Sequence, residues 1–98
     1  MPRRAIHPLR KECIKLSCDT ELVFADGYDE AILGVAIRDG HSVVAYNSEA
    51  VIDILCQRDG MDRDEAEEFF DFNIQGAWIG EATPIFVAPV RQSVGRRR

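Results

Sequence analysis

One segment sets the architecture of this 98-residue chain: residues 60–87, which read GMDRDEAEEFFDFNIQGAWIGEATPIFV. Asp62 can cap the start of a helix, because its carboxylate accepts free backbone N–H groups, and Glu65 stands where a capping box needs it. Apolar side chains then recur with helical spacing. The pattern predicts a helix over about 62–76 and a strand near 84–88, which Pro84 introduces.

An amide lies in the middle of the apolar side of this helix. At about 100° per residue, Asn73 falls beside Phe69 and Phe70, on the side that should be buried. A buried amide without hydrogen-bond partners costs about 1–3 kcal/mol. Two interpretations stay open: Asn73 fastens the nearby backbone of residues 76–83, or it faces a pocket.

The residues before this segment predict a β-hairpin and a second helix. AILGVAI (31–37) and SVVAY (42–46) flank Asp39-Gly40, a pair typical of a two-residue hairpin turn. We expect three cross-strand pairs: Arg38 with His41, Val35 with Val44, and Leu33 with Tyr46. Residues 48–58 read as a helix that Asn47 or Ser48 caps and Gly60 ends.

Two earlier segments are less regular. ELVFADG (21–27) ends an apolar run at a turn, which indicates a strand near 21–25. Residues 9–17 fit a helix or a strand, and we favour a short helix. The fold class is therefore α+β: a small, mainly antiparallel sheet with a helical hairpin (about 48–58 and 62–76) packed on one face. The sheet combines the hairpin at about 31–46 with strands near 21–25 and 84–88.

Length and composition indicate a single domain over residues 1–98, with flexible basic tails at 1–8 and 91–98. No apolar run approaches the roughly 20 residues of a membrane span, so we expect no membrane association and a cytoplasmic location. Three cysteines without CxxC spacing predict free thiols. We assign no metal site, cofactor or catalytic residue.

The net charge of −5 hides a division along the chain. Residues 1–15 and 91–98 hold nine Lys/Arg and one acid, a net of +8, whereas residues 16–90 hold three Arg and sixteen acids, a net of −13. An acidic body can serve to bind a basic protein partner and argues against duplex DNA as the main partner, although composition alone favours a merely solvated surface. A solvated surface that only aids solubility, and a homo-oligomer, both stay open.

Two groups of polar residues are candidate binding sites. Carboxylates around the ADGYDE turn can converge with Glu81 to bind Mg²⁺ or transfer protons, although their spacing matches no EF-hand loop. The polar side of the 62–76 helix offers acids to a basic partner. The candidate binding residues are Asp26, Tyr28, Asp29, Glu30, Glu68, Asp71, Asn73 and Glu81.

Three motifs together resemble a small uncharacterised family found mostly in bacteriophages and prophages: DGYDEAI, a later Tyr, and GMDRDEAEEFFDFNIQGAWIGEATP. The resemblance covers roughly residues 22–87, and Asn47 departs from the Asp that the family usually places there. It implies phage or prophage origin and a host bacterial cytoplasm, but no particular activity. The matching positions are Asp26, Gly27, Tyr28, Asp29, Ala31, Ile32, Tyr46, Gly60, Met61, Glu65, Ala66, Phe70, Phe72, Asn73, Gly76, Ala77, Gly80, Glu81, Thr83 and Pro84.

The function we expect is that of a non-enzymatic phage-type accessory protein, which binds a host or phage protein through an acidic surface and so modulates a host process or defence. One alternative is a small enzyme or ligand-binding protein with a carboxylate site at Asp26–Glu30 and Glu81. Another is contact with nucleic acid through the basic tails.

Overall fold

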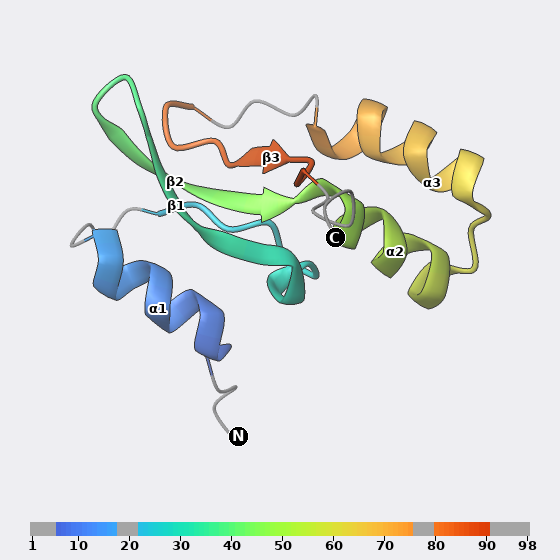
Figure 1. Ribbon diagram of the computed structural model, residues 1–98, viewed down its shortest axis with the longest axis horizontal. Coiled ribbons are helices and arrows are strands. Elements are labelled where there is room, and N and C mark those ends of the chain that lie inside the picture. Colours follow the sequence, from blue (N-terminus) through green and yellow to red (C-terminus); the bar gives the residue numbers. More distant parts are fainter. Residues whose placement is uncertain (1–5, 18–21, 76–79, 91–98) are drawn as a thin grey trace, which may run out of the picture.

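The computed structural model describes residues 6–17, 22–75 and 80–90, and these form an α+β fold (Figure 1). Both predicted tails extend beyond these ranges, at residues 1–5 and 91–98. The described elements are α1 (Pro8–Ser17), the 3₁₀ turn η1 (Asp29–Ala31), β1 (Ile32–Arg38), β2 (His41–Asn47), α2 (Ser48–Asp59), α3 (Arg63–Phe69), the π-helical turn η2 (Phe70–Gln75) and β3 (Ile85–Val87).

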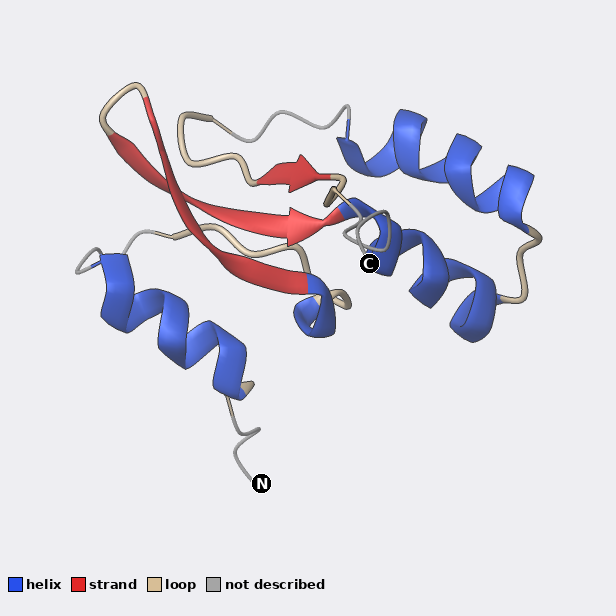
Figure 2. Cartoon of the chain, in the orientation of Figure 1, coloured by secondary structure: helices blue, strands red, loops and turns tan. Residues whose placement is uncertain are grey.

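The sheet has the order β1-β2-β3, with β1 antiparallel and β3 parallel to β2 (Figure 2). Asp39 and Gly40 have φ values of 51° and 82°, the positive pair that a two-residue hairpin turn requires. The predicted pairing of Arg38 with His41 is confirmed, as is that of Val35 with Val44.

The predicted pairing of Leu33 with Tyr46 is wrong. A register shift between Ile32 and Gly34 places Ile32 opposite Tyr46, and Leu33 stays 53% exposed. An extra residue in one strand of an antiparallel pair has this effect, because it leaves that residue unpaired and shifts all those beyond it.

The predicted strand near 21–25 is also wrong for residues 22–25, which run without regular structure. The N–H of Ala25 donates to the Tyr46 hydroxyl at 2.7 Å instead of to a neighbouring strand. Leu22 and Phe24 pack against the core all the same. Their partial burial explains the apolar run, but in the part of the chain that the structure describes no strand pairs with residues 22–25.

The short helix favoured for residues 9–17 is confirmed as α1, which lies against β1. Pro8 is its first residue, a position that suits proline because no intrahelical N–H bond is lost there. The buried Cys13 places its sulfur 3.9 Å from the carbonyl oxygen of Gly34 in β1. Cys13 and Cys56 are both free thiols.

The predicted helical hairpin forms from α2 and α3. Asn47 caps α2 by accepting from the N–H of Ala50 at 3.2 Å, and Gly60 ends it with a φ of 72°. Asp62 and Glu65 complete the capping box of α3, with hydrogen bonds of 2.8 and 3.0 Å. The regular α-helix is shorter than predicted, since it gives way to η2 at Phe70.

The core lies between the sheet and the helices, around the fully buried Tyr46. Its ring stacks on Phe86 of β3 at 5.5 Å between centroids, and Phe86 meets the edge of Phe70 at 5.1 Å. Because α1, the sheet, α2 and α3 all contribute side chains, one core holds these elements together. The buried members of this core are Cys13, Ala31, Ile32, Val44, Tyr46, Val51, Ile52, Leu55, Ala66 and Phe70.

No helix in the described ranges is long and apolar enough to cross a bilayer.

Candidate interaction surface

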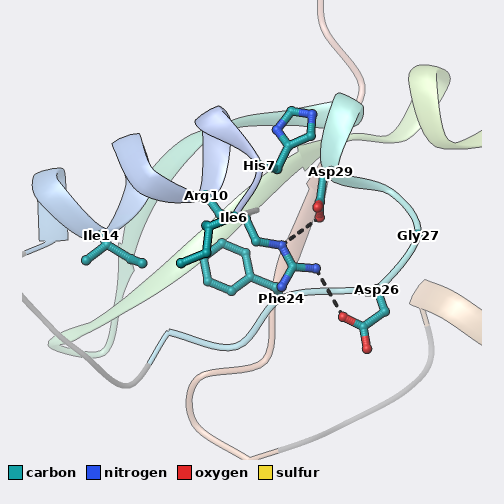
Figure 3. A pocket seen from close by; sticks show the side chains of 8 residues that line it. All are labelled: Ile6, His7, Arg10, Ile14, Phe24, Asp26, Gly27 and Asp29. Carbon is teal, nitrogen blue, oxygen red and sulfur yellow. Dashed lines mark hydrogen bonds and ion pairs between the residues drawn. The ribbon is translucent and has the colours of Figure 1, made fainter. Parts of the chain in front are cut away.

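The carboxylates of the 25–29 turn are already paired with an arginine of α1. Arg10 contacts Asp29 through Nε at 2.9 Å and Asp26 through Nη2 at 3.0 Å, the two interactions drawn as dashed lines in Figure 3. The guanidinium also lies 4.7 Å from the centre of the Phe24 ring. Burial lowers the pKa of Arg10, but the hydrogen bonds to Asp26 and Asp29 outweigh it, and the pKa is raised overall.

This arrangement borders an open hollow of about 580 Å³, which Ile6, His7 and Ile14 complete (Figure 3). Arg10 forms ion pairs with both carboxylates, so their negative charge is already balanced in part by a side chain of the protein. Their observed role is to attach α1 to the turn before β1.

A second arginine holds the same turn from α2. Nη1 of Arg58 donates to the carbonyl oxygen of Gly27 at 2.8 Å, and its guanidinium lies 5.1 Å from the centre of the Tyr28 ring. Gly27 has a φ of 96°, and a Cβ there would stand 3.1 Å from Arg58 Nη1. Hydrogen bonds to Asp59 and to the Tyr28 hydroxyl raise the pKa of Arg58. The turn thus links α1 to α2.

Glu81 lies in another part of the fold. Its carboxylate is 3.0 Å from His41 Nε2, and its carbonyl oxygen accepts from Arg38 Nη2 at 2.8 Å. Arg38 ends β1, whereas Asp29 precedes the start of β1, so Glu81 and Asp29 are held at opposite ends of that strand. Glu30 is exposed in η1. The structure therefore brings Asp26 and Asp29 together at Arg10 but holds Glu81 apart from them.

The described residues contain no cluster of three or more His, Cys, Asp or Glu suited to a metal ion. The two arginines that organise the turn were not among the predicted site residues. The excess of basic residues near the N-terminus was the available signal for Arg10, because a strongly acidic body attracts such a helix.

The acidic side of α3 carries exposed aromatic rings. Phe72 is 77% exposed, and Phe69 is 37% exposed although helical spacing places it on the side predicted to be buried. For Phe72 the reason is the change from α-helix to π-helix at Phe70, which alters the angular position of every later side chain. We call the hollow of about 320 Å³ on this side the α3 face; its lining residues are Met61, Glu65, Glu68, Phe69, Phe72 and Asn73.

The prediction that Asn73 lies on the buried, apolar side of the 62–76 helix is wrong, because the residue is exposed in η2. It lines the α3 face and also a second hollow of about 190 Å³, which we call the anchor hollow. The pocket interpretation of Asn73 therefore has the geometric support, while Asp71 is exposed on η2 outside both hollows. The anchor hollow is lined by Ala25, Tyr28, Asn73, Ile74, Thr83, Pro84 and Phe86.

Salt bridges join the two acidic helices α2 and α3. Arg63 at the start of α3 contacts Glu49 of α2 at 2.6 Å and Glu67 at 2.9 Å. Hydrogen bonds to Glu67 and Glu49 raise the pKa of Arg63. Glu65 bonds the backbone of Asp62, whereas Glu68 is exposed on the α3 face. Glu49, Glu65 and Glu67 thus take part in interactions within the helical hairpin, whereas the Glu68 side chain is exposed to solvent.

Comparison with known proteins adds no relative. The chain matches no protein-family model, no curated protein and no solved structure.

Proposed function

We propose that this chain is a non-enzymatic accessory protein of phage type, which binds a basic segment of a host or phage protein through the α3 face. The observation that carries the proposal is the pair of exposed rings, Phe69 and Phe72, beside Glu65 and Glu68 in one hollow. Exposed aromatic side chains are typical anchors of protein interfaces, because they bury a large area with few rotatable bonds.

Charge supports the same choice of partner. Residues 16–90 carry a net −13, and a surface of one sign steers oppositely charged partners toward it. The phage type and the host bacterial cytoplasm follow from the resemblance given above. The carboxylate-site alternative is weaker, because Arg10 occupies Asp26 and Asp29 while Glu81 pairs with His41.

The test is a titration of the ¹⁵N-labelled chain with a short synthetic Lys/Leu peptide. We expect chemical-shift changes at Glu68, Phe69 and Phe72, and weaker binding as salt rises from about 50 to about 300 mM, because the screening length of exposed charges falls from about 14 Å to about 6 Å over this range. A Glu/Leu peptide should not bind.

Two double variants separate the face from total charge. Glu68→Lys, which reverses a charge in the α3 face, combined with Asp71→Lys, which reverses the exposed charge three residues further on in η2, should abolish the binding. The control, Glu12→Lys with Glu30→Lys, changes the net charge equally at exposed positions on α1 and η1. If both pairs weaken binding to the same extent, the peptide senses only total charge and the proposal fails.

A further inference from the structure

We infer that the anchor hollow receives one apolar ring of the partner, so that the recognised segment is an aromatic residue next to basic ones. This inference rests on the proposed function and specifies the partner of the same surface. It starts from the position of Asn73, which lines both the anchor hollow and the α3 face. A single bound segment can therefore occupy the two hollows at once.

The size of the anchor hollow selects its occupant. Its volume of about 190 Å³ falls below the roughly 300–1,000 Å³ of ordinary small-molecule sites. An apolar cavity of about 150 Å³ already holds benzene. A phenyl ring presented on a polypeptide therefore fits this space better than a free metabolite does.

The chemistry of the walls agrees with an aromatic occupant. Ile74, Pro84 and Phe86 supply apolar surface. Phe86 is held on two sides, by Tyr46 at 5.5 Å and by Phe70 at 5.1 Å, so this wall does not have to form on binding. Thr83 is buried, and its hydroxyl donates to the carbonyl oxygen of Gly80 at 2.6 Å, which fixes the loop before Pro84. A preformed wall lowers the entropic cost of binding.

Polar groups lie where the partner backbone would pass. The amide of Asn73 offers both a donor and an acceptor between the two hollows. On its other side, Glu65 and Glu68 line the α3 face and favour Lys or Arg next to the anchor. Charge complementarity thus selects a basic segment, and the anchor hollow selects its aromatic residue.

The test uses two synthetic peptides that differ at one position: a Lys-rich peptide with a single Phe, and the same peptide with Ala in place of Phe. Burial of a phenyl ring predicts about ten- to hundredfold tighter binding of the Phe peptide to the full chain. Shifts of the Ile74 methyl signals and contacts from the peptide ring to Ile74 should accompany that binding.

Ala25→Leu fills the hollow and should bring the two affinities close to equality. Ala36→Leu is the matched control, since it enlarges a half-buried alanine of β1 away from the hollow and should preserve the preference. Asn73→Ala, at an exposed position, gives a second variant that does not threaten the fold; it should weaken both peptides.

The outcomes separate the inference from the proposed function. Equal affinity of the two peptides, with salt-dependent shifts at Glu68, would overturn the anchor hollow and leave the α3 face standing. Absence of shifts at Glu68 with either peptide would overturn both. A preference for the Phe peptide that survives Ala25→Leu would mean that the peptide ring binds outside the anchor hollow. Ile74 shifts that depend on protein concentration without peptide would mean that a second copy of the chain occupies the hollow. Either result would overturn the inference.

Discussion

Tyr46 shows how one residue links the strands to the rest of the core. Its hydroxyl accepts from Ala25 N–H, while its ring packs on Phe86. Burial raises the pKa of Tyr46 to about 12, against about 10 in an unfolded chain. Because the folded chain retains this proton more strongly, the associated stability is fully present below about pH 10 and is lost as the pH rises through about 12.

The expected loss is about 2–3 kcal/mol in the free energy of unfolding between about pH 10 and pH 12. Urea denaturation across this range measures it. Tyr46→Phe should be less stable at neutral pH, because Ala25 N–H loses its partner, yet should lose less stability on going to high pH. Equal pH dependence in both chains would refute the role of Tyr46.

Asn73 gives the opposite expectation at the same scale. Since it is exposed, Asn73→Ala should change the free energy of unfolding by no more than about 0.5 kcal/mol. Thr83→Val is the comparison, because the Thr83 hydroxyl is buried and hydrogen-bonded to Gly80, and about 1–3 kcal/mol should be lost. A comparable loss for Asn73→Ala in urea would restore the role of a structural fastener.

At the scale of elements, the stability of α3 depends on the capping of its first turn, because the helix has only seven residues before η2 begins. Asp62→Ala removes the carboxylate that accepts from Glu65 N–H and should cost about 0.5–2 kcal/mol. Asp64→Ala removes an acid from the same turn without touching the capping box, and its cost should stay within a few tenths of a kcal/mol. Chemical denaturation of both variants checks this order; equal losses would mean that charge, not capping, matters.

The 25–29 turn contributes to stability by linking α1 to α2 through Arg10 and Arg58. The Asp29 side chain is 23% exposed and that of Asp26 is 96% exposed, although both contact Arg10. Asp29→Ala should therefore cost about 1–2 kcal/mol, while Asp26→Ala should cause no measurable change. Melting temperatures with and without Mg²⁺ complete the test. A Mg²⁺-dependent increase that Asp29→Asn removes would favour the carboxylate-site alternative instead.

For the whole molecule, a single core predicts a single unfolding transition. Leu55 of α2 is fully buried in the cluster that also contains Cys13 of α1 and Val44 of β2. Leu55→Ala should cost about 2–5 kcal/mol and should shift the loss of helix and of tertiary structure together. Leu33→Ala, at an exposed position, is the control and should change little. Two separate transitions by far- and near-ultraviolet circular dichroism would contradict one shared core.

Short-range signals in the sequence were sufficient for most elements. The capping box of Asp62 and Glu65, the Asn47 cap and the Asp39-Gly40 turn each depend on hydrogen bonds or dihedral angles within a few residues. Because these interactions join groups that are close in sequence, they do not depend on the rest of the fold. The helical hairpin, the β-hairpin and the α+β class were therefore predictable.

Tertiary structure decided the rest. Whether residues 22–25 pair as a strand depends on Tyr46, which takes the Ala25 N–H, and the carboxylates of the turn depend on Arg10, sixteen residues or more away. In η2, Phe70 packs against Phe86 while Phe72 turns outward. Helical periodicity assumes one constant angle per residue, and it cannot foresee a π-helical turn. The α3 face is formed within residues 61–73, but the anchor hollow combines residues 25–28, 73–74 and 83–86, which only the folded chain brings together.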